Sequence, residues 1–302
     1  MKIAHVVNPV KFKPASELAV AQPISFESIR VAKEFAKGKT EVELFAIGYE
    51  EDREIVPPFF TQLPNLNRSI LDFGKFSNPK KYPLLNDVFR ALYNATDAEY
   101  LIYTNIDIAL MPQFYTAVSE ILKQGHDALL INRRGIATHY KTAEELPMMY
   151  SDFGKPHPGF DCFIFKRELL DKIILENICL GVSFSEIAVV HNFIAFAENL
   201  KLVDDRHLTF HLGTEVMPPL DQEYYWHNRN EYEQKIYPRI KHLLRIEKFP
   251  YSHLPFYKRM LKWILNPNFR TKQVVELEGK RFTRRLKHKI DSLRFSLLDK
   301  TK

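Results

Sequence analysis

The stretch Tyr100-Leu-Ile-Tyr-Thr-Asn-Ile-Asp-Ile-Ala-Leu110 combines an apolar run with two polar side chains that follow it closely. The run predicts a buried strand, and Asn105 and Asp107 come at its C-terminal end. Side chains alternate along a strand, so these two groups share one side of the sheet if the chain stays extended. Oxygen-bearing side chains at this position suit a divalent cation or a ribose hydroxyl, but the ending of the strand explains them equally well.

Strand and helix patterns alternate on both sides of this stretch. We expect strands at residues 2–7, 41–47, 68–73 and 127–132, and helices at 25–37, 84–93 and 111–122, with loops at 10–23 and 50–67. This alternation predicts an α/β fold of three layers, α/β/α, with a mostly parallel central sheet. The chain contains neither Gly-x-Gly-x-x-Gly nor Gly-x-x-x-x-Gly-Lys-Ser/Thr, which argues against dinucleotide-binding dehydrogenases and P-loop enzymes.

Charge divides the chain into two parts. Residues 1–234 carry 24 Lys and Arg against 32 Asp and Glu, whereas residues 235–302 carry 19 against 5. We therefore expect a domain at 1–220 and a basic, aromatic, helical C-terminal extension at 221–302. With two cysteines and no signal-peptide pattern in its first residues, the chain is expected to be cytoplasmic.

The extension interleaves apolar and basic residues over 249–302, and Trp263 lies in the first such segment. This pattern is typical of a helix in the interface of an anionic membrane, on whose inner face the protein would be peripheral. A helix packed on the preceding domain is the other interpretation. Nucleic acid is a competing partner, but no recognisable reading module is present, so specific nucleic-acid binding is not expected.

The order of the motifs resembles that of GT-A-type nucleotide-sugar glycosyltransferases over about residues 1–215. Asn105-Ile-Asp107 is similar to the Asp-x-Asp motif of that family, and Gly159-Phe-Asp161 to its turn beside donor sugar and acceptor. Ser185-Glu186 resembles the place of the acidic base in inverting members, and His211-Leu-Gly213 the late histidine of the metal site. The resemblance implies a hexosyltransferase that moves a sugar from a nucleotide-diphosphate donor to a glycan or lipid-linked acceptor.

The chemistry of sugar transfer suggests a role for each candidate residue. The leaving diphosphate needs positive charge, which Mn²⁺ or Mg²⁺ on Asp107 and His211 would supply. An acceptor hydroxyl needs a base, for which Glu186 and Asp161 are the candidates. The remaining candidates are Asn8, Asp72, Asn105, Arg133 and Arg134 for the donor, and His157 and Gly159 for the acceptor side.

Two other functions stay open. A sugar-phosphate nucleotidyltransferase has the same fold, but it usually carries a Gly-rich loop after its first strand, where this chain has Asn8-Pro-Val-Lys-Phe-Lys13. A non-catalytic binding protein of this fold, with a basic tail that contacts nucleic acid or membrane, is the second. Asn105, where the family motif has Asp, favours that second alternative.

Overall fold

A computed structural model describes residues 1–12, 16–204, 206–213 and 221–299. The strands are β1 (Lys2–Val7), β2 (Glu41–Ala46), β3 (Thr61–Gln62), β4 (Tyr100–Thr104), β5 (Ala109–Leu110), β6 (Ala128–Ile136), β7 (Lys155–Lys166), β8 (Leu200–Val203) and β9 (Thr209–Leu212). The α-helices are α1 (Leu18–Ala36), α2 (Leu85–Ala95), α3 (Phe114–Leu122), α4 (Leu146–Met149), α5 (Ser185–Phe196), α6 (Gln222–Asn230), α7 (Tyr237–Ile240), α8 (Phe256–Leu265) and α9 (Thr271–Asp299).

The strands join in one sheet with the order β3-β2-β1-β4-β7-β6-β9-β5, and β8 also pairs with β6. Parallel pairs join β1 to β2 and β4, β2 to β3, and β6 to β8 and β9. Antiparallel pairs join β7 to β4 and β6, and β5 to β9. The prediction of a mostly parallel sheet is confirmed. Because β1, β2 and β4 run in the same direction, their C-terminal ends meet at one edge.

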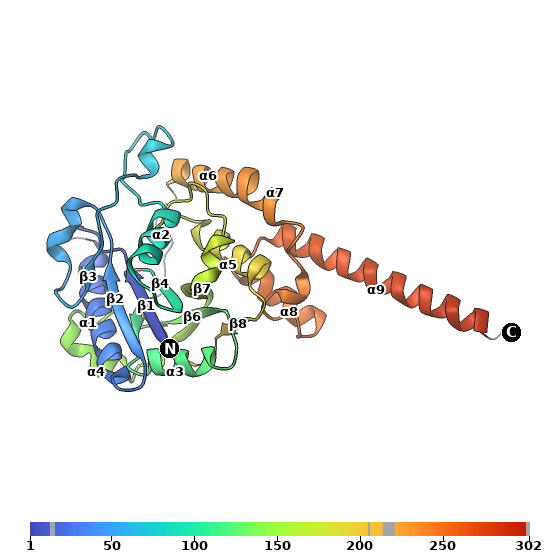
Figure 1. Cartoon of the computed structure of the whole chain (residues 1–302), viewed down its shortest axis with the longest axis horizontal. Coiled ribbons are helices and arrows are strands. Elements are labelled where there is room, and N and C mark those ends of the chain that lie inside the picture. Colours follow the sequence, from blue (N-terminus) through green and yellow to red (C-terminus); the bar gives the residue numbers. More distant parts are fainter. Residues whose placement is uncertain (13–15, 205, 214–220, 300–302) are drawn as a thin grey trace.

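Helices cover both faces of the sheet (Figure 1). Leu101 and Tyr103 of β4 point into a core that includes residues of α2 and α5. Tyr100 and Ile102 point into the opposite core, which includes residues of α1 and α3. The alternation along β4 therefore separates the two cores, and the predicted three-layer α/β/α fold is confirmed.

Two loop and strand predictions were wrong. Residues 68–73 do not form a strand, because the Asp72 carboxylate accepts a hydrogen bond from Ser69 N at 2.7 Å and closes the short 3₁₀ helix η2 (Ile70–Asp72). The loop predicted for 10–23 ends early, since α1 begins at Leu18 and includes Pro23. Burial of residues on both sides of Pro23 offsets the backbone hydrogen bond that proline cannot make.

The C-terminal extension is helical, as predicted, and it shares the main core. Tyr232, Ile240 and Trp263 are buried in the same cluster as α2 and α5. The helix α9 then extends away from the rest of the chain (Figure 1). Among the described helices, none is both long and apolar enough to cross a membrane. The predicted domain boundary at residue 220 lies outside the described residues.

Candidate functional site

The predicted acidic residues converge on Tyr103, the buried tyrosine near the end of β4. Burial raises the pKa of the Tyr103 phenol well above its ordinary value, and the charges of Glu186, Asp107 and Asp161 raise this pKa further. Three carboxylates from separate parts of the sequence thus lie near enough to act on one hydroxyl. Sequence reasoning missed Tyr103, although a tyrosine two residues before the Asn105-Ile-Asp107 segment was the available signal.

Asp107 and His211 face each other across this site. The chain does not stay extended after β4, because Ile108 N donates to Asn105 O at 3.1 Å and closes a turn that carries Asp107. His211 lies on β9, beside Gly135 of β6, and its Nε2 is 3.2 Å from Asp107 Oδ2. A side chain at residue 135 would put its Cβ 2.8 Å from Gly213 O, so glycine permits this close approach.

The pKa values of Asp107 and His211 are shifted in the directions expected of an ion pair. Burial lowers the pKa of His211, but the hydrogen bond and charge of Asp107 outweigh burial, and the pKa lies above its ordinary value. Burial raises the pKa of Asp107, whereas His211 and then Arg133 lower it, and the net pKa lies below its ordinary value. Over the described ranges, no cluster of three or more His, Cys, Asp or Glu side chains could hold a metal ion.

Arg133 and Asp161 form a buried ion pair in which Nη1 lies 2.6 Å from Oδ1. The register between β6 and β7 shifts on either side of Asn132, and both residues of the ion pair lie at these shifts. Such irregularities turn side chains away from the regular alternation of a sheet. The predicted position of Arg133 and Arg134 at the end of a strand was wrong, since β6 continues to Ile136.

Glu186 lies in the first turn of α5. The residue before this helix, Phe184, has a φ of 80°, which is a left-handed conformation that non-glycine residues rarely adopt. Its ring is held between Tyr232 and the guanidinium of Arg270, whose centre is 5.1 Å from the ring centroid. The N-terminus of α5 thus presents a half-exposed carboxylate to the site, and the helix dipole favours its charged form.

The segment after α8 supports the strand that carries His157 and Gly159. Asn266 Nδ2 donates to Pro158 O at 2.5 Å, and Asn268 Oδ1 accepts from Phe160 N at 2.7 Å. A Cβ at Gly159 would lie 2.9 Å from His157 Cε1, so a larger residue here would push the His157 ring aside. Sequence reasoning missed both asparagines, which lie more than 100 residues from their partners.

The other predicted donor residues make contacts within the protein. Asn8 Nδ2 donates to Ile47 O at 2.6 Å, and Asn105 Oδ1 accepts from the hydroxyl of Tyr103 at 3.0 Å. Arg134 donates to the carbonyl oxygens of Phe153 and, at 3.0 Å, Gly154. Asp72 is exposed and closes η2. Donor binding by these four residues stays a prediction.

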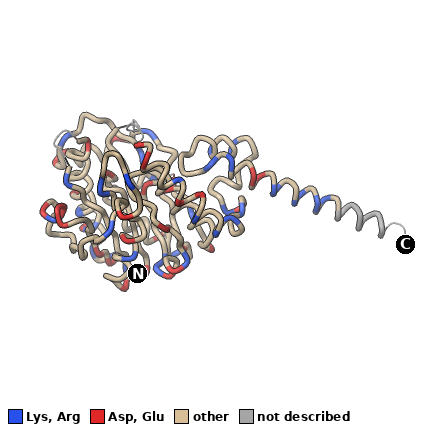
Figure 2. The backbone as a smooth tube through the Cα atoms, turned by 90° about the horizontal axis from the view of Figure 1, so that it is seen from above, with Lys and Arg blue, Asp and Glu red and all other residues tan. Residues whose placement is uncertain are grey.

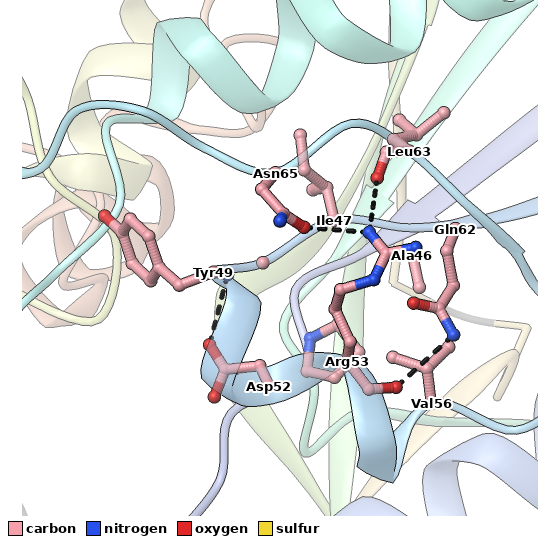
Figure 3. Close-up of a pocket in the computed structure, with 11 residues that line it drawn as sticks. Ala46, Ile47, Tyr49, Asp52, Arg53, Val56, Gln62, Leu63 and Asn65 are labelled. Carbon is pink, nitrogen blue, oxygen red and sulfur yellow. Dashed lines mark hydrogen bonds between the residues drawn. The ribbon is translucent and has the colours of Figure 1, made fainter.

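A hollow of about 10 Å³, room for roughly one water molecule, lies beside the C-terminal ends of β1 and β2 (Figure 3). Asp52 is buried there and accepts hydrogen bonds from Lys11 N at 2.7 Å and Tyr49 N at 3.2 Å. Arg53 Nη1 donates to Asn65 Oδ1 at 2.8 Å across the same hollow. The hollow lies at the edge of the sheet where Asn8 also lies.

The sequence predicts a loop over 50–67, and this prediction is wrong in part. The segment includes the 3₁₀ helix η1 (Glu50–Ile55) and β3.

Comparisons with known proteins find distant structural similarity. No protein-family model matches the chain, and no curated protein matches it. S. aureus TarS 1–349 in complex with UDP-GlcNAc is similar at 11% identity over 87% of this chain and 79% of that chain, with a TM-score of 0.44. M. tuberculosis glucosyl-3-phosphoglycerate synthase is similar at 14% identity over 76% of this chain and 77% of that chain, with a TM-score of 0.41.

A third similar structure belongs to a different named enzyme. The 4-diphosphocytidyl-2C-methyl-D-erythritol synthase of Anaerococcus prevotii is 11% identical over 77% of this chain and 99% of that chain, with a TM-score of 0.37. Similarity at this level assigns neither a reaction nor a ligand to the present chain. Its function must be argued from its own residues.

Proposed function

We propose that the chain is a glycosyltransferase that moves a sugar from a nucleotide-diphosphate donor to a glycan or lipid-linked acceptor. The observation that carries this proposal is the Asp107–His211 pair, whose Nε2 and Oδ2 are 3.2 Å apart, together with the charges of Asp107, Asp161 and Glu186 that all act on the buried Tyr103. Sugar transfer needs a group that stabilises the departing diphosphate and a carboxylate that accepts the proton of the acceptor hydroxyl. The chain offers candidates for both within one site.

Glu186 is the better candidate for the base. It is half-exposed at the start of α5, so an acceptor hydroxyl can reach it. Asp161 is buried against the guanidinium of Arg133, which holds the carboxylate in one position. We assign to Asp161 the binding of a sugar or acceptor hydroxyl, and to Arg133 the orientation of Asp161.

Asp107 and His211 would hold Mn²⁺ or Mg²⁺ together with the diphosphate. One carboxylate oxygen and one imidazole nitrogen, 3.2 Å apart, would suit two positions in the coordination shell of such a cation once the cation replaces the proton between them, with a nitrogen ligand favouring Mn²⁺. With no third His, Cys, Asp or Glu gathered there in the described ranges, the other positions fall to diphosphate oxygens and water. When bound, the cation supplies charge stabilisation to the leaving diphosphate.

The sheet edge at the C-terminal ends of β1 and β2 is our candidate for the nucleoside end of the donor, and the small hollow there would have to widen to admit a nucleoside (Figure 3). Asn8 borders this edge of the sheet and would contact the base or ribose. The acceptor would then approach from the side of His157 and Gly159, on β7. In this arrangement the donor diphosphate lies between the hollow and the Asp107–His211 pair.

The proposal is tested by thermal shift and donor hydrolysis on the full chain. We expect UDP or GDP with Mn²⁺ to raise the melting temperature, and we expect Asp107→Asn to abolish both the Mn²⁺-dependent part of this shift and donor hydrolysis. Glu120→Gln, which changes an exposed acid on α3, is the matched control and should behave as wild type. Far-UV circular dichroism checks that both variants keep their fold.

Three results would contradict the proposal. If no nucleoside diphosphate shifts the melting temperature, with or without metal, a non-catalytic binding protein is the better explanation. If Asp107→Asn retains full Mn²⁺-dependent hydrolysis, the metal role of Asp107 is wrong. Release of pyrophosphate from a nucleoside triphosphate and a sugar phosphate would instead support a nucleotidyltransferase.

A further inference from the structure

The helix α8 turns an apolar face outward. Tyr257, Leu261, Ile264 and Leu265 are 68%, 59%, 49% and 62% exposed. At 100° per residue, these four side chains fall on one arc of the helix surface. Large apolar side chains that gather on one exposed face usually mark a binding surface, whereas isolated ones do not.

The opposite face of α8 holds the helix to the body of the protein. Trp263 is fully buried, and its Nε1 donates to Pro250 O at 2.6 Å. Arg259 is also buried and forms an ion pair with Glu278 of α9. Trp263 therefore does not belong to the outward arc, which contains other residues of the same segment.

Basic residues accompany the apolar arc. Lys258 and Lys262 are exposed and lie next to Leu265 on the helix surface. A second row of exposed apolar side chains follows α9 at helical spacing, and it comprises Val275, Phe282, Leu286 and Ile290. Lys and Arg residues also lie along α9 (Figure 2). Residues 235–302 carry 19 basic against 5 acidic side chains.

We propose that the outward face of α8 docks on an anionic phospholipid bilayer. Acyl chains would cover the apolar arc, and lipid phosphates would meet Lys258 and Lys262. A second copy of the chain would bring one strongly basic segment against another. Nucleic acid would pair with the lysines but would leave Leu261 and Ile264 in water. A bilayer with anionic headgroups satisfies both features of the surface.

Docking at α8 would also affect the candidate site. This consequence rests on the proposed function. Asn266 follows the last residue of α8 directly and holds β7 through Pro158 O. Asn268, two residues later, holds Phe160 N. The acceptor side of the site is therefore attached to the segment that follows the membrane-facing helix by one buried and one partly buried hydrogen bond, an arrangement that favours a lipid-linked acceptor.

Flotation of the full chain with vesicles tests the docking surface. We expect binding to vesicles of equal parts phosphatidylcholine and phosphatidylglycerol, and little binding to phosphatidylcholine alone. Leu261→Glu/Leu265→Glu should weaken binding at least about tenfold, because two carboxylates would enter the apolar interface. Lys258→Gln/Lys262→Gln should weaken it by a smaller factor and reduce its dependence on salt.

Phe35→Glu/Met148→Glu is the matched control, since both residues are large, apolar and exposed on other helices. It should bind vesicles as wild type does. The inference is overturned if wild type does not float with anionic vesicles, or if Leu261→Glu/Leu265→Glu floats as well as wild type. It is also overturned if the wild type binds no vesicles but forms a dimer in sedimentation or an RNA complex in a gel shift, and Leu261→Glu/Leu265→Glu abolishes that dimer or complex. Because flotation needs no donor, its outcome is independent of the transferase assay.

Discussion

Arg133→Met removes the cation from the buried ion pair of the candidate site and leaves the Asp161 carboxylate behind. The side chains of the two residues are 4% and 10% exposed, and their charged atoms are 2.6 Å apart. Methionine can fill much of the space of the arginine stem. Because Asp107 and Glu186 also act on Tyr103, the variant would leave three carboxylates around one buried phenol without their buried arginine.

The expected loss of stability is large. Removing one partner of a buried ion pair costs about 3–5 kcal/mol, because the other charge stays buried and uncompensated. We therefore expect Arg133→Met and Asp161→Leu each to lower the free energy of unfolding by about 3 kcal/mol or more. The double variant leaves no buried charge at either position, so it should lie within about 1 kcal/mol of wild type. The cycle then gives a strong coupling free energy.

Urea unfolding followed by tryptophan fluorescence measures these values, since Trp263 is fully buried and Trp226 is half-exposed. Arg30→Met is the control, because Arg30 and Glu27 form an exposed ion pair on α1, whose loss should cost less than about 1 kcal/mol. The reasoning fails if Arg133→Met is as stable as Arg30→Met. It also fails if the double variant is as unstable as the sum of the single variants, since the two residues would then not be coupled.

Two further predictions concern stability. Burial lowers the pKa of His5 and of His191 from 6.5 to about 3, so the unfolded chain binds more protons between these values and stability falls as pH falls below 6.5. From pH 7 to pH 5.5 the two residues together should cost about 2.5 kcal/mol in urea unfolding, and His5→Gln should remove about half of this loss; an unchanged loss would contradict the prediction. Asn268→Ala should cost about 1–3 kcal/mol, because it leaves Phe160 N buried without its acceptor. Asn268→Asp keeps an acceptor oxygen and should recover most of this loss, so equal instability of the two variants would argue against the hydrogen bond.

Much of the fold was predictable because the central strands are buried on both faces. Tyr100–Thr104 is buried throughout, and such a strand reads as a continuous apolar run that a sequence pattern detects. The pattern failed where side chains or distant packing decide the backbone. The side chains of Ser69 and Asp72 hydrogen-bond to the nearby backbone, so a 3₁₀ helix forms instead of the predicted strand. Pro23 lies inside α1 because the burial of its neighbours stabilises the helix there.

The sequence indicated candidate residues for the site but not their arrangement. Three of these candidates, Asp107, Asp161 and Glu186, act electrostatically on Tyr103, and their roles stay predictions. The pairing of Arg133 with Asp161 depends on register shifts between β6 and β7, which no local pattern encodes. Asn266 and Asn268 act on residues 108 positions away, so only the folded chain reveals them.

The buried contacts of the C-terminal extension determine which variants can test its role in membrane binding. A buried chain of hydrogen bonds runs from His191 of α5 through the hydroxyl of Tyr232 to Gln273 of α9. Phe249 and Trp263 complete the core on the same side of the sheet. Deletion of residues 249–302 would therefore expose this core and remove the support of β7, so lost vesicle binding would have two explanations. Substitutions on the exposed arc of α8 leave those contacts in place, and they separate binding at the surface from folding of the domain.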